Sequence, residues 1–424
     1  MRTAEPRSAA AQRVPHQVDE ERWPDVAARP GASRLRTAAT SVVVRRALER
    51  LPLRVRFPDG THVGTGGPLI EIHDTGAFHE RVGAHGLVGF GESYMAGDWD
   101  APDLVGALTV LAGNLADLVP APLQRLRGLW ALRQPESQRN TPSGARGNIS
   151  RHYDLSNELF AVFLDETLTY SAAHFRGFPA DQELLAAAQH RKIDRLLDLA
   201  EVGEGTRLLE IGTGWGELAI RAAARGAHVT SLTLSREQRD LALERVRGAG
   251  LADRVSIELR DYREAVGTYD AIVSVEMVEA VGEEFWPVYF ATLDARLAPG
   301  GRVALQAITM PHDRMLASRG TYTWIQKYIF PGGRLPSVEA VDRLTSEHTA
   351  LSTTRRDALG AHYAETLRLW RERFTERADD VEALGFDETF RRMWTFYLAY
   401  SEAGFRSGYL DVQQYLFTKG EPTR

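Results

Sequence analysis

Residues Arg207-Leu-Leu-Glu-Ile-Gly-Thr-Gly-Trp-Gly216 decide the fold of this chain. The mostly apolar run at 207–211 is typical of a strand that is buried on both faces. Glycines follow at 212, 214 and 216, and glycine lets the backbone turn tightly and approach a ligand closely. A helical segment at 217–224 comes next, so the sequence predicts a ligand site at the carboxyl end of a parallel sheet.

Expected strands and helices alternate after this turn. Strands are expected at 228–234, 255–259, 270–275 and 301–309, and helices at 236–249 and 284–297. Ser235 is suited to cap the first of these helices, and Gln238 three residues later completes the pattern of a capping box. The alternation predicts an α/β fold with a doubly wound, mostly parallel sheet.

The spacing of the glycines indicates which ligand the turn would hold. A dinucleotide fingerprint reads G-x-G-x-x-G and has an acid at the end of the next strand. Here the spacing is G-x-G-x-G, and the next strand ends in Thr233-Leu234-Ser235 without an acid, which disfavours NAD. Glu210, just before the glycines, is typical of S-adenosylmethionine methyltransferases. On this motif alone, another nucleotide-binding fold and a purely structural turn remain alternatives.

The length of 424 residues predicts more than one domain. Residues 1–36 are rich in Ala, Arg and Pro without a period, and we expect a disordered tail there. Residues 37–134 are expected to form a small N-terminal α+β domain, with strands at 53–57 and 69–72 and an apolar helix at 103–119. A polar linker is expected at 135–148, and the domain that carries the glycine turn at 149–424.

Composition excludes several functional classes. The chain has no cysteine, which rules out disulfides, thiolate metal ligands and a catalytic cysteine, and no metal site is expected. The net charge of -6 disfavours a uniformly basic nucleic-acid binder, so no nucleic-acid partner is expected. The sequence has neither the apolar core of a signal peptide nor an apolar run of about 18 residues. We therefore expect a cytoplasmic protein that is at most peripheral to a membrane.

One arginine-rich segment has two interpretations. Leucines and Trp130 interleave with arginines over residues 123–133. Such a helix either packs on its own domain or forms a basic amphipathic contact with anionic lipid.

Seven segments, taken in chain order, together resemble the cyclopropane fatty acid synthase and mycolic acid methyltransferase family. They are G-E-S-Y-M at 91–95, H-Y-D-L at 152–155, L-D-E-T-L-T-Y-S at 164–171, T-L-S-R-E-Q at 233–238, D-Y-R at 261–263, Y-I-F-P-G at 328–332 and H-Y-A-E-T-L at 362–367. The resemblance covers roughly residues 40–418. It implies a class I S-adenosylmethionine methyltransferase fold with a seven-stranded sheet, in the domain at 149–424.

The resemblance also implies which residues line the S-adenosylmethionine site. They are Tyr153, Tyr170, Ser171, Gly212, Gly214, Thr233, Leu234, Gln238, Tyr262 and Arg263. Backbone at the two glycines can approach the methionyl end of the ligand, and Thr233 and Gln238 can form hydrogen bonds with it. Tyr153 and Tyr170 offer aromatic faces to a sulfonium, although ordinary packing is the alternative for each tyrosine.

Members of the family act on a double bond in a phospholipid acyl chain, and in cyclopropane-forming relatives a bound bicarbonate serves as the base. This sequence departs from the family at several of the bicarbonate ligands. Ala172 occupies the position where the family has a cysteine, and Ala280 and Gln306 occupy positions where the family has histidines. Glu279 and Tyr363 are retained, whereas Glu276 stands where the family usually has glycine.

These departures suggest that Glu276 replaces bicarbonate as the general base. Two negative charges in one dry site are costly, so a carboxylate and a bicarbonate should exclude each other. In this hypothesis Glu279, Gln306 and Tyr363 position Glu276 or order water around it. The alternative is that Glu276 points to solvent or caps the following helix.

The V-E-M-V-E-A-V-G pattern at 275–282 resembles the actinobacterial subgroup that makes 10-methylene fatty acids, the precursors of tuberculostearic acid. This resemblance implies an oleoyl phospholipid substrate, a 10-methylenestearoyl product and a separate reductase that yields 10-methylstearate. It also implies a peripheral location at the inner face of the cell membrane, and a homodimer as in many relatives. Trp324, Tyr328 and Phe330 are candidate tunnel walls or membrane contacts, with plain core as the alternative.

Three other functions are consistent with the same residues. The first is a cyclopropane synthase that tolerates the changed pocket, and the second is a small-molecule methyltransferase on the same fold. The third is a catalytically inactive, lipid-binding paralogue, although the retained Gly212 turn, Gln238, Glu279 and Tyr363 argue against it.

Overall fold

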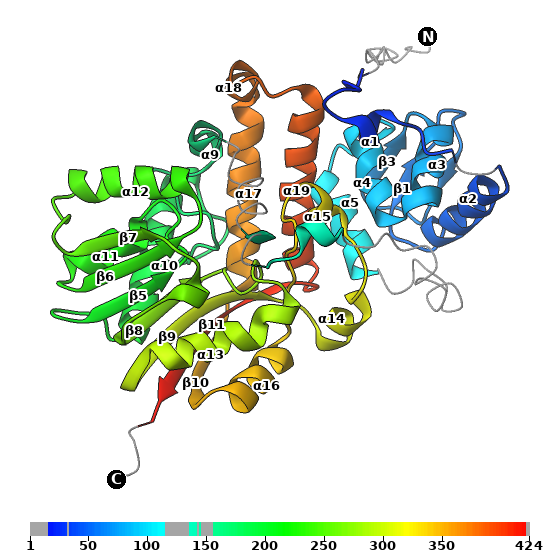
Figure 1. Ribbon diagram of the computed structural model, residues 1–424. Helices are drawn as coiled ribbons and strands as arrows, with labels where there is room; N and C mark the ends of the chain where they lie inside the picture. Colours follow the sequence, from blue (N-terminus) through cyan, green and yellow to red (C-terminus); the bar gives the residue numbers. More distant parts are fainter. Residues whose placement is uncertain (1–15, 32–33, 115–134, 142–143, 146–155, 421–424) are drawn as a thin grey trace.

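A seven-stranded sheet forms the centre of the larger part of the protein (Figure 1). The computed structural model describes residues 16–31, 34–114, 135–141, 144–145 and 156–420. The strand order is β10-β11-β9-β8-β5-β6-β7. The strands are β5 (Arg207–Ile211), β6 (His228–Thr233), β7 (Val255–Leu259), β8 (Tyr269–Val275), β9 (Leu297–Thr309), β10 (Leu351–Ala358) and β11 (Asp411–Lys419). Strands β9, β8, β5, β6 and β7 are parallel, and β11 runs antiparallel to β9 and β10. The expected doubly wound, mostly parallel sheet is confirmed.

Helices cover both faces of this sheet because successive strand residues point to opposite sides. In β5, Leu208 faces the core under α10 (Leu185–Leu199), α11 (Glu217–Ala224) and α12 (Arg236–Gly248). The next residue, Leu209, faces the core under α13 (Trp286–Arg296) and α16 (Val338–His348). Both leucines are fully buried. The carboxyl ends of the parallel strands are thus held between two packed layers.

Two long helices, α17 (Gly360–Glu376) and α19 (Glu388–Arg406), lie side by side between the sheet and the N-terminal part (Figure 1). The short helix α18 (Ala378–Ala383) connects them. Helix α19 packs on α4 (Leu87–Met95) and α5 (Leu104–Gly113) of the N-terminal part as well as on α17. It is therefore a shared wall between the two parts.

The N-terminal part has a small sheet of its own, with strand order β2-β1-β3-β4. Its elements include α2 (Arg34–Leu48), β1 (Arg54–Arg56), β2 (His62–Val63), β3 (Leu69–Ile72), α3 (Thr75–His85) and β4 (Trp99–Asp100). The strands expected at 53–57 and 69–72 are present, and α5 covers the first part of the apolar helix expected at 103–119. Its core is continuous with α17 and α19, where Trp99 and Phe396 lie edge to face. The division of the chain into domains at residue 134 stays a prediction.

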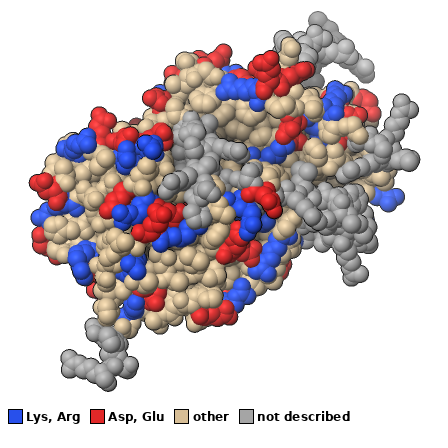
Figure 2. Space-filling model, in the orientation of Figure 1, with Lys and Arg blue, Asp and Glu red and all other residues tan. Residues whose placement is uncertain are grey.

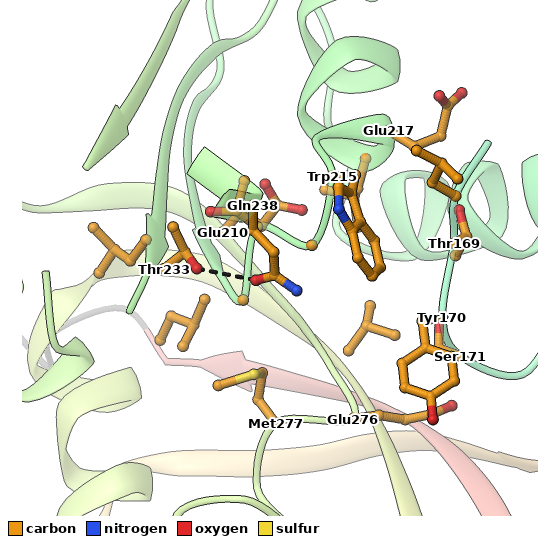
Figure 3. A pocket seen from close by; sticks show the side chains of 18 of the residues that line it. Thr169, Tyr170, Ser171, Glu210, Trp215, Glu217, Thr233, Gln238, Glu276 and Met277 are labelled. Atoms are coloured by element: carbon orange, nitrogen blue, oxygen red, sulfur yellow. Dashed lines mark hydrogen bonds between the residues drawn. The ribbon is translucent and has the colours of Figure 1, made fainter. Parts of the chain in front are cut away.

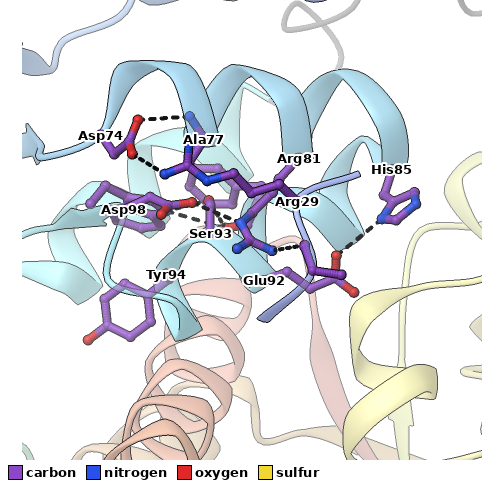
Figure 4. A network of polar contacts seen from close by, with 12 residues as sticks. Arg29, Asp74, Ala77, Arg81, His85, Glu92, Ser93, Tyr94 and Asp98 are labelled. Atoms are coloured by element: carbon purple, nitrogen blue, oxygen red, sulfur yellow. Dashed lines mark hydrogen bonds and ion pairs between the residues drawn. The ribbon is translucent and has the colours of Figure 1, made fainter. Parts of the chain in front are cut away.

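The segment at 16–31 corrects one expectation. We expected a disordered tail over residues 1–36, but this stretch packs on the rest of the molecule and contains α1 (Pro24–Ala27). Val26 is fully buried, and the Trp23 indole N–H donates to Asp387 at 2.7 Å. Arg29 pairs with Asp74 at 2.6 Å (Figure 4). Two apolar anchors in a polar stretch have no period, so the sequence pattern did not reveal them; residues 1–15 lie outside the described residues.

The G-E-S-Y-M segment at 91–95 holds two helices together. Glu92 is fully buried, and its carboxylate accepts hydrogen bonds from Lys327 at 2.5 Å and Tyr328 at 2.9 Å. These two residues belong to α15 (Trp324–Tyr328), so α15 is tied to α4. Nearby, Arg81 donates to buried Asp98 at 3.0 Å (Figure 4), and burial raises the pKa of Asp98 to about 6. Trp324 is buried against Phe396, so it belongs to the core and is not a surface contact.

The polar stretch around residue 138 is also packed against the larger part. Gln138 and Asn140 are buried, and their side-chain amides donate to the Tyr322 hydroxyl at 2.8 Å and the Gly332 carbonyl at 3.0 Å. The polar side chains of this stretch therefore form specific hydrogen bonds with the larger part, in addition to their place in a connecting segment.

The structure bears only in part on the two expectations about membranes, the absence of a spanning helix and the arginine-rich segment. Within the described ranges, no helix is both long and apolar enough to cross a bilayer. Over the face in Figure 2, Lys and Arg side chains are interspersed with Asp and Glu. The arginine-rich segment at 123–133 lies outside the described residues, so both of its interpretations stay predictions.

Candidate active site

A cavity opens at the carboxyl ends of β5, β6 and β8, where the sequence predicts a ligand site (Figure 3). The structure brings most of the predicted cofactor residues to its wall. These are Tyr170, Ser171, Gly212, Gly214, Thr233, Leu234, Gln238 and Tyr262. Glu276 lines the same cavity, so the predicted cofactor residues and the predicted base share one space. Their individual roles stay predictions.

Two glycines shape the floor of the cavity. Gly212 has a φ of 99°, and a Cβ there would meet the Met277 side chain at 2.5 Å. Gly214 has a φ of 52°, and a Cβ there would meet no atom within 4 Å. The first glycine is needed for close packing, whereas the second leaves open space for a ligand.

The start of α12 places Gln238 at the cavity. The Ser235 hydroxyl accepts the Gln238 N–H at 3.1 Å, which confirms Ser235 as the N-cap. The expected capping box is wrong in its second half, because the Ser235 N–H is taken by the Thr233 hydroxyl. The Gln238 side-chain oxygen instead accepts from the Thr233 hydroxyl at 3.1 Å, and its amide nitrogen points into the cavity (Figure 3). Gln238 is thereby available as a hydrogen-bond donor to a ligand.

Two predicted cofactor residues are not among those that the structure places at the cavity. Tyr153 lies outside the described residues. The Arg263 guanidinium turns away, because Asp261 holds it at 2.6 Å and the Asn140 carbonyl accepts from it at 3.2 Å. The short turn at Tyr262–Glu264 sends Tyr262 into the cavity and Arg263 out of it. Burial raises the pKa of Tyr262 to about 12.

Glu276 follows β8 directly and turns inward. Its φ is 53°, a left-handed conformation that costs a non-glycine residue about 1–3 kcal/mol. Its Oε1 accepts the Ala172 N–H at 2.9 Å and the Gln306 amide at 2.7 Å. Its Oε2 accepts the Tyr363 hydroxyl at 2.9 Å. The carboxylate therefore neither points to solvent nor caps a helix, and a glutamate is kept where the backbone favours glycine.

The surroundings of Glu276 act on its proton affinity in opposite directions. Burial raises the pKa of Glu276 above its usual range. The Ala172 N–H, the Lys192 ammonium, Gln306 and Tyr363 favour the ionised form and limit the rise. A carboxylate whose pKa is raised by burial, and which several donors hold in place, is suited to act as a general base.

Glu279 is buried beside Glu276 without sharing its hydrogen bonds. Its Oε1 accepts the Ile308 N–H, and its Oε2 has no hydrogen-bond partner among the described residues. Burial, and then the charge of Glu276, raise the pKa of Glu279 to about 8. Burial and the charge of Glu276 therefore keep Glu279 protonated at neutral pH.

Lys192 is a site residue that the sequence analysis missed. It lies on α10, is 1% exposed, and donates to the Ser171 hydroxyl at 2.6 Å. Burial lowers the pKa of Lys192 to about 8, against the opposing effect of Glu276, Asp165 and Glu210. A signal was present, because Lys192 lies on the helix face that also carries Leu185 and Leu196.

Glu210 and Trp215 also line the cavity. The Ser231 hydroxyl donates to Glu210 at 2.5 Å, and burial raises the pKa of Glu210 to about 8. The Trp215 indole N–H donates to Asn157 at 2.8 Å, which fixes the ring as a wall.

Comparison with known proteins identifies the family of the chain. The family model described as mycolic acid cyclopropane synthetase matches residues 140–415, which include the glycine turn, Glu276 and Tyr363. The chain belongs to this family. Membership in the mycolic acid cyclopropane synthetase family agrees with the ordered motifs of the sequence.

Two curated members of the family match nearly the whole chain or most of it. The tuberculostearic acid methyltransferase UfaA1 of Mycobacterium tuberculosis is 56% identical over 418 residues, which are 96% of this chain and 97% of that protein. The cyclopropane-fatty-acyl-phospholipid synthase of Escherichia coli K12 is 34% identical over 345 residues, which are 81% of this chain and 86% of that protein.

Solved structures of the family share the fold of the larger part. Mycolic acid cyclopropane synthase CmaA1, complexed with SAH and CTAB, superposes with a TM-score of 0.60 at 31% identity, over 68% of this chain and 99% of that one. Cyclopropane synthase MmaA2 from Mycobacterium tuberculosis gives 0.59 at 32% identity, over 65% of this chain and 98% of that one. The class I S-adenosylmethionine methyltransferase fold is confirmed.

Proposed function

We propose that the protein is an S-adenosylmethionine-dependent methyltransferase that acts on the double bond of an oleoyl chain in a phospholipid and produces a 10-methylene branch. The observation that carries this proposal is the Glu276 carboxylate, held inside the cavity by Ala172, Gln306 and Tyr363. The relative at 56% identity, a tuberculostearic acid methyltransferase, supports the same product class.

The cavity fits S-adenosylmethionine in its donors and its free space. Gly214 leaves room beside the turn, and the Gln238 amide offers a hydrogen bond. Tyr170 and Trp215 provide aromatic surface for a sulfonium. When bound, S-adenosylmethionine supplies an electrophilic methyl group. Arg263 is a weaker candidate for the cofactor site because Asp261 holds its guanidinium away from the cavity, whereas Tyr153 stays a predicted cofactor residue.

Methylation of a double bond leaves a positive charge on the acyl chain, and a proton must then leave. Loss of a proton from the new methyl group directly closes a cyclopropane ring. If a hydride first shifts along the chain, the same loss gives an exocyclic methylene. In either case Glu276 accepts the proton, and the rings of Tyr170 and Tyr363 stabilise the cation.

The hydrogen bonds around Glu276 favour the side chain as base over a bound bicarbonate. The Ala172 N–H, the Gln306 amide and the Tyr363 hydroxyl, which a small anion would need, all donate to Glu276. A second negative charge in this buried space would also be costly. Gln306 and Tyr363 thus position the base, and Glu279, protonated at neutral pH, adds no competing charge.

The proposal extends to the partners and location of the enzyme. We assign the reduction of the methylene branch to a separate reductase, because the sequence contains no G-x-G-x-x-G fingerprint for a second cofactor. We further propose that the protein works at the inner face of the cell membrane as a peripheral cytoplasmic protein, and that it forms a homodimer. Support for an acyl substrate comes from the CmaA1 structure, which holds CTAB, a molecule with a long alkyl chain.

The direct experiment is expression in a bacterial host that lacks its own cyclopropane synthase and is fed oleate, followed by mass spectrometry of the fatty acids. A methylene-branched C19 chain supports the proposal, and a Glu276→Gln variant serves as the matched control. A cyclopropane ring would instead make the protein a cyclopropane synthase. Unchanged oleate would overturn the proposal, and S-adenosylmethionine binding would then separate a small-molecule methyltransferase from an inactive paralogue.

A further inference from the structure

A row of polar side chains crosses three strands and ends at Glu276. Gln306 of β9 is paired in register with Gln414 of β11, and Gln414 is paired with Asp357 of β10. Gln306 and Gln414 are both fully buried. Arg195 of α10 joins the row from the helix layer above. Buried amides in the middle of a sheet are costly unless every group is paired, so a row of this kind calls for a physical reason.

Each member of the row donates to the next in one direction. The Arg195 Nε donates to Gln414 Oε1 at 2.6 Å, while its Nη2 donates to Asp357 at 2.5 Å. The Gln414 amide nitrogen then donates to Gln306 Oε1 at 2.8 Å. The Gln306 amide nitrogen donates to Glu276 Oε1 at 2.7 Å and to the Ala172 carbonyl at 3.3 Å.

Arginine fixes this direction because a guanidinium only donates hydrogen bonds. Gln414 must therefore turn its oxygen to Arg195 and its nitrogen to Gln306. Gln306 must in turn receive that bond on its oxygen and offer its nitrogen to Glu276. The oxygen of Gln306 is occupied, so a proton on Glu276 finds no acceptor there.

We propose that Gln414 and Arg195 are positioning residues that keep Glu276 ionised, by holding Gln306 in the orientation in which it only donates to Glu276. This role rests on the proposed function of Glu276 as the base. Without Gln414, the Gln306 amide is free to turn over and to accept a proton from Glu276, which stabilises the protonated carboxyl group. Glu276 would then stay protonated, and unable to act as a base, up to a higher pH.

Other groups around Glu276 contribute to the same equilibrium and stay constant in the test. Lys192 faces it from α10, Tyr363 from α17 and Glu279 from its own loop. The Ala172 N–H completes the set. None of them belongs to the row, so a change at Gln414 leaves their chemistry in place.

Three variants test the row. Gln414→Met removes both hydrogen bonds with an unbranched side chain and adds no charge. Gln414→Glu keeps the shape and accepts from Arg195, but it forces Gln306 to turn its nitrogen away from Glu276. Gln413→Met is the matched control, because Gln413 is buried on the same strand and bonds to Asp411 instead.

Two readouts are needed. The first is the rate of methyl transfer against pH at saturating S-adenosylmethionine. The second is an infrared titration of the carboxyl band that Glu276→Gln removes, which reports the ionisation of Glu276 without any turnover. We expect Gln414→Met and Gln414→Glu to move both midpoints upward by about one pH unit, with the plateau rate at high pH within a factor of about two of wild type. Gln413→Met should leave both midpoints unchanged.

The outcomes separate the two claims. If the infrared midpoint of Glu276 is the same in wild type and in both Gln414 variants, the positioning role is wrong. A lower plateau with an unmoved midpoint would assign Gln414 a purely structural role and would also overturn it. If wild type transfers no methyl group, the proposed function fails, and the infrared midpoints still decide whether the row controls Glu276.

Discussion

Glu276 and Glu279 are two carboxyl groups in one site, and burial together with the charge of Glu276 keeps Glu279 protonated. Burial, and then the charge of Glu276, raise the pKa of Glu279 to about 8. Glu276 takes three hydrogen bonds from donors, whereas Glu279 takes one. The site therefore assigns the ionised form to Glu276.

This relationship predicts a pH-dependent stability. A carboxyl group whose pKa is raised on folding contributes stability that is complete below its ordinary value of 4.5 and is lost as the pH rises through about 8. Glu279 should therefore weaken the fold by about 1.4 kcal/mol for each pH unit between these limits. Glu279→Gln should remove this slope, measured as the free energy of unfolding in urea at several pH values. Glu284→Gln, at an exposed position, is the control, and equal slopes for Glu279→Gln and wild type would contradict the assignment.

Tyr363→Phe should slow methyl transfer about tenfold near neutral pH, because a hydrogen bond to a charged group is lost. The ionised form of Glu276 is then less stable, so the midpoint of the pH-rate profile should move upward. Binding of S-adenosylhomocysteine, measured by calorimetry, should not change. Tyr415→Phe is a matched control, since the Tyr415 hydroxyl is buried without a hydrogen-bond partner among the described residues. If the pH-rate profile of Tyr363→Phe is the same as that of wild type, Tyr363 has no role in the reaction.

Lys192→Met removes a buried cation that favours the ionised form of Glu276. The rate near neutral pH should fall at least tenfold, because the loss of the Coulomb attraction between Lys192 and Glu276 leaves more of Glu276 protonated. The rate should recover as the pH is raised. Lys419→Met, which changes a lysine at the far end of β11, should leave the profile unaltered. A rate loss that is independent of pH would mean that Lys192 supports packing alone.

Gly214→Ala should weaken S-adenosylhomocysteine binding at least tenfold, since the methyl group enters open space at the cavity. Gly205→Ala is a strict control. Its φ is 76° and its Cβ would also meet no atom within 4 Å, but it lies before β5 and outside the cavity lining. Both variants carry a similar backbone strain, so they should lose similar stability. Equal affinities for the two would place the ligand away from Gly214.

The sequence predicted the sheet because its signal is local. The strand at 207–211 and the helix at 217–224 match their elements to the residue, since burial and glycine mark both ends. The sequence pointed to Glu276 because the family usually has glycine at this position. The structure explains the usual glycine, since the backbone φ of residue 276 is 53°.

Contacts between distant segments could not be predicted in the same way. Trp23 donates to Asp387, which lies 364 positions away, and Val26 is buried where α1 packs on α4, so no local period records either contact. Gln306, Gln414 and Asp357 meet only through the antiparallel register of β9, β11 and β10. Gln238 departs from its capping box because the Thr233 hydroxyl competes for it.

The central claim is that the Glu276 carboxylate, and not a bound bicarbonate, removes the proton. Its most direct test is the rate of methyl transfer to oleoyl phospholipid by wild type and Glu276→Gly, with and without added bicarbonate. Wild type should be indifferent to bicarbonate, and Glu276→Gly should lose at least about a hundredfold in rate without it, within the range of general base catalysis. A Glu276→Gly enzyme with full activity in bicarbonate-free buffer would contradict the account.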